Sequence, residues 1–320
     1  MSDFASVVDR TRRAFATVSR LEGALARDPG NRALQINLAA AAKRAQSSQS
    51  DLMSISEYQR VEVCNYRLAT EEQPTFRVAA VSRSLIEYQN LFSQIYDALK
   101  NGPKGKAVFG RNEELESALE LAYSYSGSLG IVLFVQSERN FFEGRLDDSI
   151  AKLFEVMNIA SRADVRQVAD ELGNSVVKRL HDWSRANLDG GFSTDVQWSR
   201  SDGRKLGQFV ERDRLGKIVD LIVATSDEKV SYPLLKGALV GGDIETNQFH
   251  LVVPGGESYR GRISLDFNRN TEITLGRSYT ARLRQTTTTV YATNQDKVDF
   301  ELLSLSNPAD IAAIVERDDE

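Results

Sequence analysis

The sequence predicts an α+β protein with three modules: an N-terminal antiparallel helical hairpin, a central α+β domain with an antiparallel sheet, and a small C-terminal β-barrel or sandwich. Three patterns support this fold class. Apolar residues recur at four–three spacing over residues 1–57, strands and helices are mixed over residues 58–226, and helical periodicity is absent over residues 227–306. The first pattern is typical of paired helices and the last of short strands. Residues 307–320 are expected to form a short helix and an acidic tail.

The composition indicates a folded globular chain. Of 320 residues, 41% are hydrophobic and 27% charged, and the net charge is −5. The longest apolar runs are far too short to cross a bilayer, and the first residues do not form a secretory signal. One cysteine excludes an intrachain disulfide. We therefore expect a cytoplasmic protein without membrane association.

Residues 1–57 predict two helices that fold back on each other, since a proline and a glycine at residues 29 and 30 interrupt the apolar pattern. The stripe of the second helix has the spacing of a coiled-coil seam. The stripes predict a surface for self-association or for another protein, formed by Phe4, Val8, Phe15, Val18, Leu34, Leu38, Leu52 and Ile55. The alternative is that the hairpin packs on its own central domain.

The central domain is expected to begin with a strand near residues 61–68, paired with a second strand at Thr75–Val81. A helix over residues 85–99 should end at Gly102. Residues 118–135 predict a β-hairpin whose second strand is apolar on both faces and lies inside the sheet. Helices then predominate, one of them starting at a capping box formed by Ser161 and Asp164. A short strand is expected at Thr194–Arg200, and the last helix contains residues 215–222.

The C-terminal module contains the candidate anion-binding residues Arg260, Arg262, Arg282 and Arg284. Strand alternation turns these four side chains outward, where adjacent strands would align them for phosphate or oligonucleotide binding. The four threonines that follow them are interpreted as a turn or bulge. Against a binding role, residues 227–306 contain nine Lys and Arg and ten Asp and Glu, so a salt-bridged exterior is the favoured interpretation.

No motif fixes a reaction. The two histidines, His181 and His250, have no second histidine or cysteine at ligand spacing, and Cys64 lies in a predicted buried strand. We assign no catalytic, cofactor-binding or metal-binding residue and expect no cofactor. The leading hypothesis is a non-enzymatic assembly subunit that bridges protein partners. The alternatives are a nucleic-acid-binding accessory protein using the four arginines, and a hydrolase or nuclease with dispersed catalytic residues.

Overall fold

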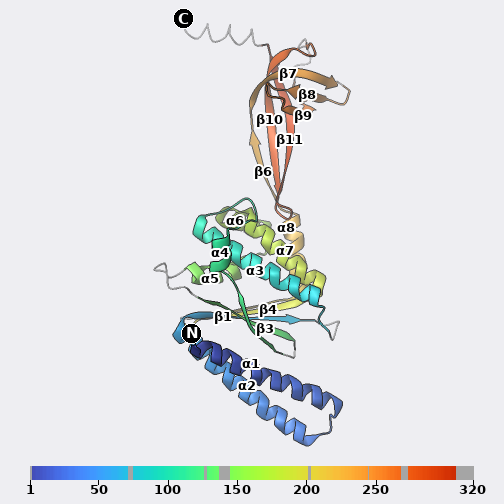
Figure 1. Cartoon of the computed structure of the whole chain (residues 1–320). Coiled ribbons are helices and arrows are strands. Elements are labelled where there is room, and N and C mark those ends of the chain that lie inside the picture. Colours follow the sequence, from blue (N-terminus) through green and yellow to red (C-terminus); the bar gives the residue numbers. More distant parts are fainter. Residues whose placement is uncertain are drawn as a thin grey trace. The chain divides into compact units, whose positions relative to one another are not determined.

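The computed structural model describes residues 2–70, 75–125, 128–136, 145–200, 203–243, 245–267 and 273–307. It confirms the predicted α+β fold with a helical pair, an antiparallel sheet and a C-terminal barrel (Figure 1). The chain divides into two compact units, one comprising Met1–Thr225 with Tyr291–Asn294 and the other Ser226–Val290 with Gln295–Glu320. The predicted domain boundaries after residues 57, 226 and 306 stay predictions.

The first unit begins with the helical hairpin, formed by α1 (Ser2–Arg27) and α2 (Arg32–Gln59). Asn31 starts α2, because its side-chain oxygen accepts a hydrogen bond from the Leu34 amide at 3.1 Å. Arg60 ends α2 in the left-handed conformation, at a φ of 55°. The chain then enters the sheet directly.

The five-stranded sheet has the order β2 (Glu120–Tyr125), β3 (Leu129–Gln136), β1 (Val61–Ala69), β4 (Ser193–Ser199) and β5 (Lys205–Val210). Every neighbouring pair is antiparallel. The predicted hairpin of β2 and β3 is confirmed. As its two apolar faces indicated, β3 lies inside the sheet.

The remaining helices of the unit are α3 (Val78–Asn101), α4 (Arg111–Glu116), α5 (Arg145–Met157), α6 (Arg162–Leu172), α7 (Asn174–Gly190) and α8 (Arg212–Val223). The predicted capping box is confirmed at the start of α6. There the Ser161 hydroxyl accepts from the Asp164 amide at 3.2 Å, and the Asp164 carboxylate accepts from the Ser161 amide at 2.9 Å. Gly102 ends α3 with a φ of 87°, a conformation that favours glycine.

Helices lie on both faces of the sheet, with the hairpin of α1 and α2 on one face (Figure 1), and a hydrophobic core fills the space on each face. On β1, Cys64, Tyr66 and Leu68 point toward the core under helices α3 and α5–α8. Val61 and Val63 have the opposite parity and point toward the hairpin. The hairpin therefore buries its base against the sheet that follows it.

The second unit contains a closed ring of β7 (Leu234–Asp243), β8 (Gln248–Val252), β9 (Ser258–Ile263), β11 (Gln295–Ser306) and β10 (Ser278–Val290). β9 and β11 are parallel, and the other neighbouring pairs are antiparallel. A further strand, β6 (Ser226–Ser231), pairs with the second half of β10. Inward side chains such as Leu251, Leu283 and Leu302 fill the barrel.

Two secondary-structure predictions are wrong. Thr75–Val81 is not a strand, because α3 begins at Val78 and both edges of β1 are already paired, with β3 and β4. The threonine run Thr286–Thr289 is not a turn but continues β10. These threonines pair with strands on both sides, and β-branched residues favour that environment. The irregularity in pairing with β11 occurs earlier, between Arg282 and Leu283.

The predicted terminal helix and acidic tail lie outside the described residues, from residue 308 onward. None of the helices described here is long and apolar enough to cross a membrane.

Candidate functional site

The eight apolar residues predicted to bind a protein partner take part in the packing of the first unit. Five of them belong to or pack against the core between hairpin and sheet: Phe4, Val8, Phe15, Leu52 and Ile55. The rings of Phe4 and Phe134 meet edge to face at 5.4 Å between centroids. Farther along the helices, Val18, Leu34 and Leu38 are half-buried. A role of these residues in binding a partner stays a prediction.

One segment of the hairpin carries a positive charge that the whole-chain balance conceals, although residues 2–59 together have a net charge of only +2. Residues 10–44 contain eight Lys and Arg and two Asp and Glu, a net charge of +6. The complete chain has a net charge of −5, so all other residues together carry −11. We call residues 10–44 the basic arm. Such a local concentration of one sign raises the affinity for ligands of the opposite sign.

Three arginines near the sheet have partners within the protein. Arg10 forms an ion pair with Asp51 at 2.9 Å, and Arg13 pairs with Asp9. Arg12 donates two hydrogen bonds to the Ala122 carbonyl of β2, at 2.6 and 3.1 Å. Arg12 therefore helps to fix α1 against the edge of the sheet.

The other cations of the basic arm have no carboxylate within ion-pair distance among the residues that the structure describes. They are all exposed: Arg20, Arg27, Arg32, Lys43 and Arg44. Arg20 and Arg27 lie two helical turns apart on α1, and each donates its Nε–H to a carbonyl of its own helix. Because these acceptors are neutral carbonyl groups, the positive charges of Arg20 and Arg27 are not neutralised by them.

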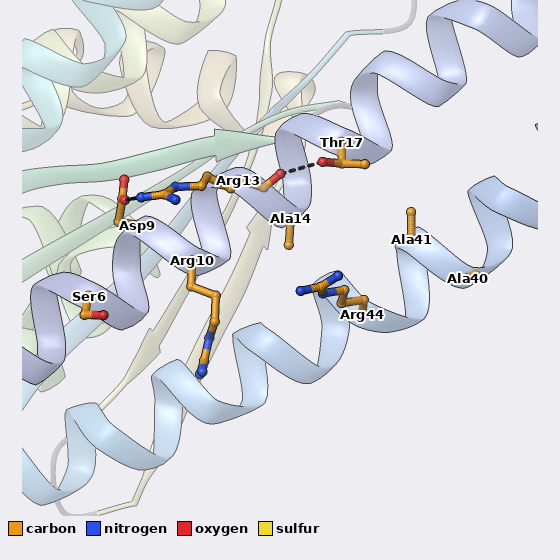
Figure 2. Close-up of a pocket in the computed structure, with 9 residues that line it drawn as sticks. All are labelled: Ser6, Asp9, Arg10, Arg13, Ala14, Thr17, Ala40, Ala41 and Arg44. Carbon is orange, nitrogen blue, oxygen red and sulfur yellow. Dashed lines mark hydrogen bonds and ion pairs between the residues drawn. The ribbon is translucent and has the colours of Figure 1, made fainter.

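A groove between α1 and α2 adds shape to this charge. It is an open hollow of about 620 Å³, with Arg10, Arg13, Ala14, Ala40, Ala41 and Arg44 among its lining residues, together with Asp9, which pairs with Arg13. Figure 2 shows Arg10 extending from α1 toward α2, and Arg44 lying on α2. The alanines are too small to fill the space between these side chains. Of the guanidinium groups that line the groove, Arg10 and Arg13 are paired with carboxylates, and Arg44 has no carboxylate partner among the described residues.

The four predicted barrel arginines do not form one strip, so the prediction that their strands are adjacent is wrong. β11 lies between β9 and β10, and its residue Glu301 is in register with Arg262 on one side and Arg284 on the other. Arg284 donates to the Glu301 carboxylate, with Nε at 2.8 Å. Arg282 instead lies over the Tyr232 ring, 5.8 Å from its centroid. The sequence does not reveal that β11, the last strand of the barrel, lies between β9 and β10.

Arg260, Arg262 and Arg284 nevertheless line one open groove of about 1490 Å³ on the barrel. Arg260 and Arg262 are exposed, and neither has a carboxylate partner among the described residues. Arg282 does not belong to this groove. The barrel therefore contains a smaller candidate site that combines two unpaired arginines and one paired arginine.

The residues weighed for catalysis are dispersed. Cys64 is completely buried under α3, and burial raises the pKa of its thiol to about 12. His181 lies on α7 of the first unit, with Nδ1 at 3.3 Å from the Asp182 carboxylate, whereas His250 lies on β8 of the second unit. Within the described ranges, no group of three or more His, Cys, Asp and Glu is positioned to hold a metal ion.

Comparisons of the chain with protein-family models, with curated proteins and with solved structures found no match.

Sequence reasoning did not identify the basic arm as a site, although its signal was present. A charge count over residues 10–44, in place of the whole chain or the barrel, would have found the excess. The sequence could not reveal which of these cations are neutralised by neighbouring carboxylates. That distinction depends on the contacts of α1 with α2 and β2.

Proposed function

We propose that this chain is a nucleic-acid-binding protein and that its basic arm binds the phosphates of a duplex. The observation that carries this proposal is the set of five exposed cations in residues 10–44 that lack a carboxylate partner among the described residues. The net charge of +6 on this segment also counts Arg10 and Arg13, which pair with Asp51 and Asp9 outside it. The proposal retains one of the function classes expected from the sequence and transfers its main site from the barrel to the hairpin.

The types of residue favour phosphate as the ligand. Seven of the eight basic residues in the arm are arginines. A guanidinium group donates two parallel hydrogen bonds to a phosphate, which adds directional bonding to charge attraction. A duplex is the matching polyanion, because it carries about one negative charge per 1.7 Å of its axis.

The other side chains of the arm argue for a duplex over different anionic surfaces. The one aromatic residue of the arm, Phe15, packs against the core, so the arm lacks an exposed ring for stacking single-stranded bases. Its exposed large hydrophobic residue is Ile36. Insertion into a bilayer surface, or into an apolar protein interface, requires a wider apolar face. The arm therefore matches a polar, regularly charged partner that is bound without regard to sequence.

The test measures the binding of a fluorescent 20-base-pair duplex to the full chain by anisotropy at low salt. We expect the variant Arg20→Gln/Arg27→Gln/Lys43→Gln/Arg44→Gln to bind roughly tenfold more weakly or worse, because four phosphate contacts are removed. Glutamine is a good helix former, so the helices should persist. Circular dichroism verifies that they do.

The matched control removes the same total charge elsewhere in the first unit, in the variant Arg162→Gln/Arg166→Gln/Lys205→Gln/Lys217→Gln. These four residues are exposed and lie on α6, β5 and α8. We expect this control to retain most of the affinity for the duplex. An equal loss in both variants, or binding of poly-glutamate or anionic vesicles as tight as that of the duplex, would contradict the proposal.

A further inference from the structure

The barrel groove is a second binding surface, in the other unit of the protein. We infer that this groove binds the phosphates of a single-stranded nucleic acid through Arg260 and Arg262. The inference does not depend on the basic arm, because its residues, its ligand form and its test are separate.

A polar row crosses five strands of the barrel at the groove. The backbone register aligns its members from β7 to β10: Asp243, Gln248, Arg262, Glu301 and Arg284. With neighbouring strands about 4.8 Å apart, the row follows a path of about 19 Å around the curved wall of the barrel. Gly241, His250 and Arg260 form a parallel row on β7, β8 and β9. The groove therefore presents hydrogen-bonding groups over a length suited to several linked units of a polymer.

Four acidic residues line the groove, Glu228, Asp243, Asp299 and Glu301, and the last three have partners within the protein. The Asp243 carboxylate accepts hydrogen bonds from the Glu245 amide at 2.8 Å and from the Thr246 hydroxyl at 2.6 Å. Glu301 accepts from Arg284. Asp299 pairs with Lys297 at 2.8 Å.

Arg260 and Arg262 have no carboxylate partner among the described residues, although four acidic and four basic side chains line the groove. They are two residues apart on β9, so strand alternation places both side chains on the same outward face. Each can donate two hydrogen bonds to a phosphate oxygen pair.

A polar atom without a partner lies beside these arginines. His250 faces Arg260 across the strand pair, and its Nε2 is inaccessible to solvent and has no hydrogen-bond partner among the described residues. On its other side His250 faces Gly241, which contributes no side chain beyond hydrogen. The imidazole of His250 thus lies between Gly241 and Arg260 on the outward face of the barrel. Glycine at such a position lets a ligand approach the backbone closely.

The size of the groove favours a chain over a small molecule. Pockets for small ligands usually enclose about 300–1,000 Å³, and this open groove has about 1490 Å³. The half-buried ring of Phe300 also lines it. That ring packs against the barrel core and meets the Tyr259 ring edge to face at 5.2 Å between centroids, so it is not free for stacking. A flexible single strand can follow the groove around the barrel, whereas a duplex is too stiff to bend around so narrow a surface.

The experiment uses the full chain with the four arm substitutions, Arg20→Gln/Arg27→Gln/Lys43→Gln/Arg44→Gln, so that the arm contributes little. A fluorescent 12-nucleotide single strand is titrated at several salt concentrations. We expect the addition of Arg260→Gln/Arg262→Gln to lower the affinity at least tenfold. It should also reduce the slope of log K against log salt by about 1.4, since each phosphate contact on a single strand contributes about 0.7.

The matched control adds Lys236→Gln/Arg277→Gln in the same background, removing two exposed charges of the barrel that lie outside the groove. It should leave both the affinity and the slope unchanged. An unchanged affinity in the groove variant, or an equal loss in the control, would overturn the inference. Competition by a mononucleotide at the same phosphate concentration would assign the groove to free nucleotides and overturn it as well. None of these outcomes depends on duplex binding by the arm.

Discussion

The packing of the hairpin against the sheet can be tested at Leu52, which lies on α2 and is 1% exposed. Replacement by alanine removes most of a buried side chain and leaves a cavity, which costs about 2–5 kcal/mol at comparable sites. Half-buried neighbours such as Phe15, Met53 and Ile55 can relax into the space. We therefore expect Leu52→Ala to lower the free energy of unfolding by about 3 kcal/mol.

For a unit of this size, that loss corresponds to a decrease in Tm of roughly 6–12 °C. Unfolding followed by tryptophan fluorescence reports the helical core, which contains Trp183 and Trp198. Circular dichroism reports the 26 and 28 residues of α1 and α2 as well. Coincident transitions would show that the hairpin unfolds together with the sheet.

The control is Ile36→Ala on the same helix, where the side chain is 61% exposed. Its effect should stay within about 0.5 kcal/mol, as is usual for surface positions. Equal effects of the two substitutions, or a loss below about 1 kcal/mol for Leu52→Ala, would refute the packing described for the hairpin base.

Three further predictions concern the first unit. Tyr66→Phe should destabilise it by about 1–3 kcal/mol in urea titrations, because the buried Trp183 indole loses the hydroxyl to which it donates at 3.0 Å. Gly173→Ala should lower Tm strongly, because Gly173 has a φ of 91° and an added Cβ would collide with the Lys104 backbone. Gly23→Ala has open space around the new methyl group and should stabilise α1 by about 0.5–1 kcal/mol. Because burial raises the pKa of Cys64 to about 12, its thiolate is scarce at pH 8 in the native protein, and a thiol reagent should react only after unfolding.

The fold could be predicted where the apolar pattern reflects local geometry. The four–three spacing in α1 and α2 is compatible only with amphipathic helices. The apolar residues on both faces of β3 are typical of a strand inside a sheet. Thr75–Val81 was misassigned because a short apolar run fits either a strand or the first turn of a helix. The structure resolves it as helix, since α3 covers the sheet and β1 has no free edge.

The candidate sites depend on contacts that periodicity does not encode. Alternation correctly turned Arg260 and Arg262 outward, but the parallel pairing of β9 with β11 joins segments about 40 residues apart and separates them from Arg284. In the arm, the excess of positive charge is visible in the sequence. Only the structure distinguishes Arg12, which is bonded to β2, from Arg20, which has no carboxylate partner.

The salt dependence of duplex binding tests the central claim most directly. Counterion release contributes a slope of about −0.9 in log K against log salt for each phosphate contact on a duplex. If Arg20, Arg27, Lys43 and Arg44 all contact phosphates, their joint replacement by glutamine should make the wild-type slope shallower by about 3.6. Identical slopes for the wild-type protein and this variant would show that the basic arm does not bind the duplex.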